Sequence, residues 1–165
     1  MPYDGRPVMA EIARDQSDAR LRQISFCLPN RLGALFRATQ NLEREHIRVR
    51  GLNILDSADH AVIRMVVDRT HDAIKALTAA GYPVFETEIL GVALPAAEEG
   101  GIRKVLSALL GAEVNILYSY ALTVQVTGQP VLALKVDDAG MAARVVRGAG
   151  LSLVDHDELG RQEGA

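Results

Sequence analysis

The sequence contains an internal duplication with a period of about 67 residues, and this repeat limits the folds that the 165-residue chain can adopt. Gly33, which precedes an apolar-periodic segment, returns as Gly100. Asp68 returns as Asp137, 69 residues later, so the second copy has gained two residues. A unit of this length is too long for a solenoid repeat and has the size of a small α/β domain. The sequence therefore predicts two similar domains in tandem.

Hydrophobic periodicity predicts a strand followed by a helix at the start of the first copy. Residues 22–28 alternate between apolar and polar side chains, which is typical of a half-buried strand. From Gly33 to Glu45, apolar side chains recur at helical spacing and define one stripe. The predicted stripe consists of Leu32, Leu35, Phe36, Thr39 and Leu42. We expect this stripe to pack on the buried face of the strand.

The rest of the first copy is predicted to be a hairpin, a helix and a strand. Residues 47–55 and 61–67 are rich in β-branched side chains and flank a turn-forming stretch, which indicates an antiparallel hairpin. A helix follows, with Thr70 as its N-cap and Gly81 as the residue that ends it. A strand from Val84 completes the order βαββαβ.

The second copy follows the same order. Its predicted elements are a strand at 90–94, a helix with Ile102, Val105, Leu106 and Leu109, a hairpin of 114–126 and 130–136, a helix with Met141, Ala142, Val145 and Val146 that stops at Gly150, and a strand at 151–154. Two helices over one face of a four-stranded antiparallel sheet form the ferredoxin-like fold. The predicted class is α+β, with two ferredoxin-like domains in tandem and helices on one face of each antiparallel sheet. We place the domains at 18–88 and 89–160, after an N-terminal tail at 1–17 that is mobile or docks on a partner.

The two copies are expected to be held rigidly together. No Gly-, Ser- or Pro-rich linker separates them, because strand-like sequence continues from Pro83 to Leu94. The unpaired N–H and C=O groups of a sheet edge attract another strand. We expect the two units to pair their edges with each other and the remaining edges or faces to pair with a second chain, which gives a homodimer.

The charge balance argues against nucleic acid and membrane surfaces as partners. The chain has 18 Lys and Arg against 21 Asp and Glu, a net charge of −3, so it has no overall positive field. It also contains no N-terminal apolar segment of the signal-peptide kind and no apolar stretch long enough to span a bilayer. We expect a cytoplasmic protein.

An enzyme of this size needs a nucleophile, a general base or a metal, and the sequence offers no convincing set. His46, His60, His71 and His156 form none of the usual metal-ligand spacings. Cys27 is the single cysteine, which excludes an internal disulfide and a cysteine zinc site, and no base lies near it in the sequence. Glycine-rich phosphate loops and the GxSxG motif are absent. We therefore predict no catalytic residues, no cofactor and no metal.

A basic cluster is one candidate anion site. The cluster consists of Arg44 at the end of the predicted helix, Arg48 and Arg50 on one face of a predicted strand, and Arg64 on the other strand of the hairpin. Such a cluster could receive a carboxylate or phosphate, or it could face solvent or a dimer partner.

The start of the first helix in each copy is a second candidate. Gly33, and Gly100 with Gly101, allow close approach of the backbone, and the first helical N–H groups have no partner within the helix. A helix N-terminus of this kind binds a carboxylate through backbone donors and the positive end of the helix dipole. The glycines could also serve the turn alone.

Three segments resemble one known family. Residues 29–54 (PNRLGALFRATQNLEREHIRVRGLNI) and 98–122 (EEGGIRKVLSALLGAEVNILYSYAL) resemble the strand–helix–strand signature of ACT domains. Residues 136–151 (VDDAGMAARVVRGAGL) resemble the family's later strand–helix–strand portion. The resemblance covers roughly residues 20–158, with two copies of the signature in register.

The resemblance implies a regulatory module that binds amino acids between paired domains. It implies that the loop before the first helix and an Asn at the start of the next strand contact the ligand's carboxylate and ammonium. The ligand-binding residues implied in this way are Asn30, Arg31, Leu32, Gly33, Ala34, Leu35 and Arg48 in the first copy, and Gly100, Gly101, Ile102 and Asn115 in the second. Arg48 stands where the second copy has Asn115, and residues 96–99 lengthen the second loop and add negative charge, so one of the two sites could be degenerate.

Chains made only of two such domains resemble stand-alone amino-acid sensors. The leading hypothesis is a non-enzymatic, dimeric regulatory protein that binds a small molecule, an amino acid, and thereby alters its own pairing or its contact with a partner enzyme. The alternative is a regulatory subunit of an amino-acid-metabolism enzyme that acts by protein contact alone, and an unrecognised enzyme is a third class. A soft-metal carrier would need two loop cysteines, and an RNA-recognition domain would need strand aromatics, whereas Phe and Tyr total seven.

Overall fold

The computed structural model describes residues 19–95 and 100–161 of the chain. Its elements are β1 (Leu21–Pro29), α1 (Ala34–Arg44), β2 (Val49–Asp56), β3 (His60–Val67), α2 (Thr70–Ala79), β4 (Val84–Ala93), α3 (Gly101–Gly111), β5 (Ile116–Val126), β6 (Gln129–Val136), α4 (Ala139–Gly148), β7 (Ser152–Val154) and α5 (His156–Gly160). This order confirms two βαββαβ units of the α+β class, followed by a short helix. The predicted tail at 1–17 and the lengthened loop at 96–99 lie outside the described residues.

Strand β4 belongs to both units. Its first part pairs antiparallel with β1, from Val84 opposite Phe26 to Ile89 opposite Leu21. Its second part, from Leu90 onward, pairs with β6 and with β7. One strand therefore closes the first sheet, in the order β2-β3-β1-β4, and opens the second sheet, in the order β5-β6-β4-β7. The predicted junction between residues 88 and 89 falls inside this continuous strand.

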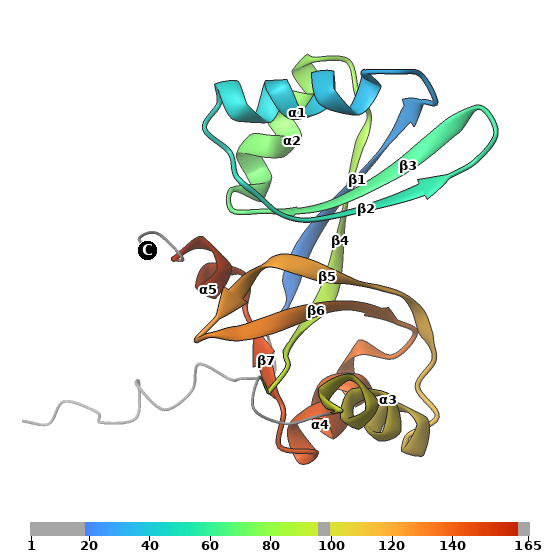
Figure 1. The fold of residues 1–165 in the computed structure, drawn as a ribbon, viewed down its shortest axis with the longest axis vertical. Helices are drawn as coiled ribbons and strands as arrows, with labels where there is room; N and C mark the ends of the chain where they lie inside the picture. The colour runs from blue at the N-terminus through green and yellow to red at the C-terminus, as the bar shows by residue number, and fades with distance from the viewer. Residues whose placement is uncertain (1–18, 96–99, 162–165) are drawn as a thin grey trace, which may run out of the picture.

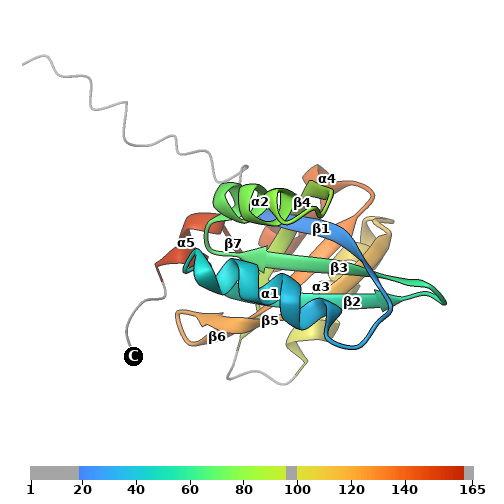
Figure 2. The same ribbon diagram turned by 90° about the horizontal axis from the view of Figure 1, so that it is seen from above.

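The molecule has four layers, which are helices, sheet, sheet and helices (Figure 1), and the view from above shows α1 and α2 lying over the strands of the first sheet (Figure 2). Helices α1 and α2 cover the outer face of the first sheet, and α3 and α4 cover the outer face of the second. The inner faces bury a shared cluster that includes Leu21, Val66 and Tyr120. The units thus pack face to face. The expectation of edge-to-edge pairing within the chain is wrong, because among the described residues β2 and β5, at the two ends of the ladder, each have one ladder partner.

The buried stripe of α1 matches the predicted one only in part, because Leu42 is buried and Leu35 packs against the core, but Leu32 and Phe36 do not. Ala34, Ala38 and Leu42 face the sheet and are buried, whereas Leu32 and Phe36 are 102% and 65% exposed. The small side chains at positions i and i+4 let the helix lie close to the strands, so the larger apolar residues are turned outward. Helix α1 therefore presents a partly apolar outer surface.

A polar network lies between the two sheets. The side chain of Gln23 on β1 is fully buried. It accepts a hydrogen bond from the Tyr120 hydroxyl at 2.9 Å and donates to the Tyr118 hydroxyl at 2.8 Å. The guanidinium of Arg64 stacks on the Tyr118 ring, 4.0 Å from its centroid. This network ties β1 and β3 of the first unit to β5 of the second.

Candidate functional site

The first helix of each unit starts after a left-handed glycine. Gly33 precedes α1 with φ of +77°, and Gly100 precedes α3 with φ of +90°. Neither helix start has a side-chain cap, whereas Asp138 caps α4 by accepting a hydrogen bond from the Met141 amide at 2.8 Å. Because first-turn amides have no partner within the helix, these two helix starts offer donors to an external group. We call them the helix mouths.

Contacts with the β2–β3 turn hold the helix mouth of the first unit in place. The Asn30 amide N–H donates to the Asp59 carbonyl, and its side chain donates to Asp56 Oδ1, both at 3.0 Å. The Ala34 amide donates to the Arg31 carbonyl at 3.1 Å. The Asn30 side chain and the Ala34 amide, both predicted to contact a ligand, therefore already have partners within the loop.

The opposite end of each unit carries a duplicated clamp. The Arg48 amide donates to Asp68 Oδ1 at 3.0 Å, and the Asn115 amide donates to Asp137 Oδ1 at 3.0 Å. In return, the amides of both aspartates donate to the carbonyls of Arg48 and Asn115, at 3.1 Å in each unit. Arg48 and Asn115 thus occupy equivalent places at the start of the second strand. The recurrence of Asp68 as Asp137 in the sequence was the signal for this clamp.

Within the first unit, the helix mouth and the clamp lie far apart. Gly33 lies at the start of α1, and Arg48 follows the end of α1. An 11-residue helix spans roughly 16 Å at 1.5 Å per residue. A ligand the size of an amino acid cannot contact both, so the predicted residues of the first unit form two separate groups.

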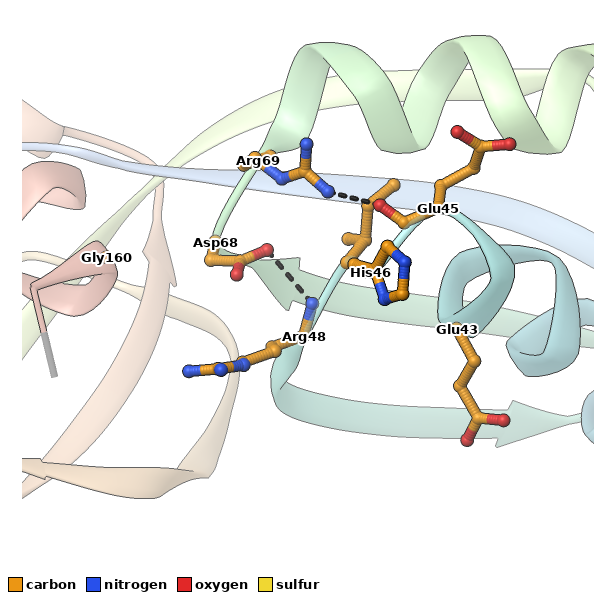
Figure 3. Close-up of a pocket in the computed structure, with 8 residues that line it drawn as sticks. Glu43, Glu45, His46, Arg48, Asp68, Arg69 and Gly160 are labelled. Atoms are coloured by element: carbon orange, nitrogen blue, oxygen red, sulfur yellow. Dashed lines mark hydrogen bonds between the residues drawn. The ribbon is translucent and has the colours of Figure 1, made fainter. Parts of the chain in front are cut away.

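A pocket of about 740 Å³ surrounds the clamp of the first unit (Figure 3). It is lined by Glu43, Glu45, His46, Ile47, Arg48, Asp68, Arg69 and Gly160. The pocket is open to solvent and carries both signs of charge, with Arg48 extending toward the end of α5 and the Glu43 carboxylate lying on the opposite side. Arg69 donates to the Glu45 carbonyl and pairs with Asp72 at 3.1 Å.

Sequence reasoning selected only Arg48 from this pocket. The wall formed by Gly160 was missed because α5 was not predicted. A signal was present, since Asp155 and Glu158 have the spacing of a capping box and form one in the structure. The acidic and basic residues at the end of α1 had no local pattern that distinguished them from a solvated helix face.

Helix α5 is attached to the first unit through His156. Its Nδ1 accepts a hydrogen bond from the Arg22 amide at 3.2 Å, and its Nε2 lies 3.0 Å from Thr70 Oγ1. Nδ1 accepts, so Nε2 carries the proton and donates to Thr70. The prediction that Thr70 caps α2 is wrong, because Arg69 is the N-cap residue and the Thr70 hydroxyl is directed to His156, 86 residues away in the sequence.

The attachment of α5 should weaken in mild acid. Burial lowers the pKa of His156 below its ordinary value of 6.5, Arg22 lowers it further, and neighbouring carboxylates oppose the change. Between 6.5 and the lowered native pKa, the unfolded chain binds more protons than the folded one, so stability falls as the pH falls through this range and is fully retained above 6.5. Urea unfolding measured from pH 7.5 to 5 should show this loss, and His156→Gln should reduce it. His71→Gln, at an exposed site, is the control and should leave the slope unchanged.

Within residues 19–95 and 100–161, no three His, Cys, Asp or Glu side chains gather closely enough to hold a metal ion. No helix in the same two segments is long and apolar enough to cross a membrane.

The duplicated fold and its two helix mouths agree with a match to a family model. The model that describes an ACT domain pair matches residues 19–162. This chain belongs to the ACT domain pair family. A comparison with curated protein sequences gives no match.

Solved structures share the fold of this chain. Protein BT0572 from Bacteroides thetaiotaomicron is similar with a TM-score of 0.79 and 25% identity, over 87% of this chain and 97% of that one. The ligand-free regulatory subunit of aspartate kinase from Thermus thermophilus has a TM-score of 0.59 and 19% identity, over 80% and 94% of the two chains. The corresponding subunit from Thermus flavus has a TM-score of 0.53 and 18% identity, over 81% and 94%. At these identities, the two kinase subunits show a shared fold.

Proposed function

We propose that this ACT domain pair is a non-enzymatic sensor that binds an amino acid as a homodimer and passes its occupancy to a partner enzyme. The observation that carries the proposal is the presence of one uncapped helix mouth in each unit, preceded in both by a left-handed glycine. Two donors at a helix start suit a carboxylate. The ACT family membership supports an amino acid as the source of that carboxylate.

A homodimer brings together a helix mouth and a clamp, which lie apart within one unit. Strands β2 and β5 end the ladder, and both carry exposed apolar residues. The exposed apolar residues of these strands and of the first helix of each unit are Leu32 just before α1, Phe36 on α1 and Leu52 and Ile54 on β2 in the first unit, and Ile102, Leu106 and Leu110 on α3 and Leu117 on β5 in the second. If two β2 edges pair antiparallel about a two-fold axis, the end of one strand lies beside the start of the other. The helix mouth of one protomer then approaches the Arg48 clamp of its partner.

The second candidate function is control by protein contact without a ligand. The same exposed apolar residues favour it, since patches of this kind mark contact surfaces. The two functions differ in one measurable respect, because a contact-only subunit binds its enzyme equally well with and without amino acids.

Isothermal titration of the protein with each of the twenty amino acids tests the proposal. We expect a saturable heat with one chemical group of amino acids, and an affinity about tenfold or more weaker in Gly33→Ala or Gly100→Ala, because alanine strains a positive φ and shifts the mouth. Gly81→Ala is the matched control, since Gly81 has φ of +91° at the end of α2 and no atoms near its Cβ position. Sedimentation velocity on the same samples should give the mass of a dimer. If none of the twenty amino acids gives a saturable heat, ligand sensing is refuted.

A further inference from the structure

Arg50 is a cation buried where the two units meet. It lies in a β-bulge, since the register of β2 against β3 shifts between Val49 and Gly51. Its carbonyl accepts a hydrogen bond from Thr123 Oγ1 on β5 at 3.0 Å. A Cβ added to Gly51 would lie only 2.3 Å from Leu122 Cδ2 on the same strand. The residue is 7% exposed, so its charge lies within the packed junction of β2 and β5.

One edge of the Arg50 guanidinium has no partner. Its Nε and Nη2 are both buried, and no hydrogen-bond partner for either exists among the described residues. These two nitrogens form the side of the guanidinium whose N–H bonds run parallel, and this side binds two oxygens of a carboxylate or phosphate at once. A buried charge without compensation is unfavourable. The free edge is therefore complementary to an oxyanion in both geometry and charge.

The fold itself does not require an arginine at this position. In the second unit the register of β5 against β6 shifts between Ile116 and Tyr118, so the same bulge is present there. The residue in that bulge is Leu117, which is 55% exposed. The duplication has kept the bulge and changed its residue, so the arginine is a specific feature of the first unit.

The pocket shown in Figure 3 lies near Arg50 in the sequence, but Arg50 is not one of the residues that line it. It opens at the start of β2, where Arg48 lines it two residues before Arg50, with Gly160 of α5 also contributing to the wall. Strand β2 is at the end of the ladder, and a bulge on such a strand is less firmly held than a regular ladder. Because Nε and Nη2 of Arg50 are buried, an anion reaches them only when β2 moves relative to β5.

We infer that Arg50 binds a small oxyanion, a carboxylate or a phosphate, through its Nε and Nη2 at the junction of β2 and β5. This site is separate from both helix mouths, and the equivalent position of the second unit carries Leu117. An anion bound there is held between strands of the two units, so its occupancy stabilises their packing against each other.

Thermal unfolding of the full chain tests this inference with inorganic phosphate and with acetate, each at an ionic strength matched with sodium chloride. We expect a saturable rise in Tm for at least one of them, about 5–10 °C at an anion concentration near 100 times the dissociation constant. A response to phosphate alone or to acetate alone identifies which source of the oxyanion the site takes. No saturable response to either anion overturns the inference.

Arg50→Leu places the residue of the second unit in the first and should abolish the saturable response. Arg50→Lys keeps the charge without the paired donors and should weaken it, which provides a second variant if the leucine chain folds poorly. Arg44→Leu removes an equal charge from the exposed last turn of α1 and should respond like the wild type. An undiminished response in both Arg50 variants would contradict the assignment. Gly33→Ala should show the same saturable rise in Tm as the wild type. The test of the Arg50 site therefore holds even if amino acids do not bind at the helix mouths.

Discussion

Replacing Leu21 by alanine should lower the free energy of unfolding by about 2–5 kcal/mol, the usual cost of truncating a fully buried leucine. Leu21 is 0% exposed and belongs to the cluster between the sheets. It pairs with Ile89 at the point where β4 leaves the first sheet, and its Cδ1 lies 2.6 Å from where a Cβ on Gly91 would be. The truncation therefore opens a cavity at the joint of the two units.

Urea unfolding followed by circular dichroism measures this change. Because both sheets contain β4, we expect one cooperative transition with an unaltered slope and a lower midpoint. Phe85→Ala is the control, since Phe85 is 68% exposed on β4 and lies outside the surfaces proposed for the dimer, and its truncation should cost less than about 1 kcal/mol. If the two variants were equally stable, the face-to-face packing of the sheets would not contribute to the free energy of unfolding.

The order of the elements was predictable because the signals for it are local. Period-2 and helical spacing depend on neighbouring residues, and the duplication supplied each pattern twice. The glycines that end or precede helices were also informative, since Gly33, Gly81, Gly100 and Gly150 all have positive φ. These positions need no knowledge of the rest of the chain.

Which face of α1 is buried could not be predicted from spacing. The segment contains two overlapping apolar stripes, one through Ala34 and Ala38 and one through Leu32 and Phe36. Counting hydrophobicity favours the larger residues, whereas close approach of the helix to the sheet favours the alanines. The larger side chains would be explained by a partner chain, which the sequence of a single protomer does not reveal.

The candidate site was predictable only in part. The helix mouths follow from glycine placement, and the equivalence of Arg48 and Asn115 follows from the repeat. The burial of Arg50 was not predictable, because it depends on Thr123 and its neighbours on β5, more than 70 residues away. The sequence had left open whether the basic cluster receives an anion or faces solvent, and 7% exposure of Arg50 excludes a solvated face for this member.

The network around Gln23 also depends on residues far away in the sequence. Its removal should cause a second large loss of stability. Gln23→Leu keeps the volume of the side chain but removes the acceptor of the Tyr120 hydroxyl and the donor to the Tyr118 hydroxyl. The Tyr120 hydroxyl is then buried without a partner, which costs about 1–3 kcal/mol. Burial already raises the pKa of Tyr120, because its surroundings disfavour the charged phenolate.

A double-mutant cycle with Tyr120→Phe separates this hydrogen bond from general packing. Tyr120→Phe alone leaves the Gln23 oxygen unpaired, whereas the double variant removes both partners and leaves neither group unsatisfied. The double variant should therefore be more stable than the sum of the two single changes implies, with a coupling energy of at least about 1 kcal/mol in urea unfolding. Simple additivity would mean that each group finds another partner when the first is removed. In that case the network would not specify how the two sheets register on each other, and apolar contacts of residues such as Leu21 and Val66 would fix that register alone.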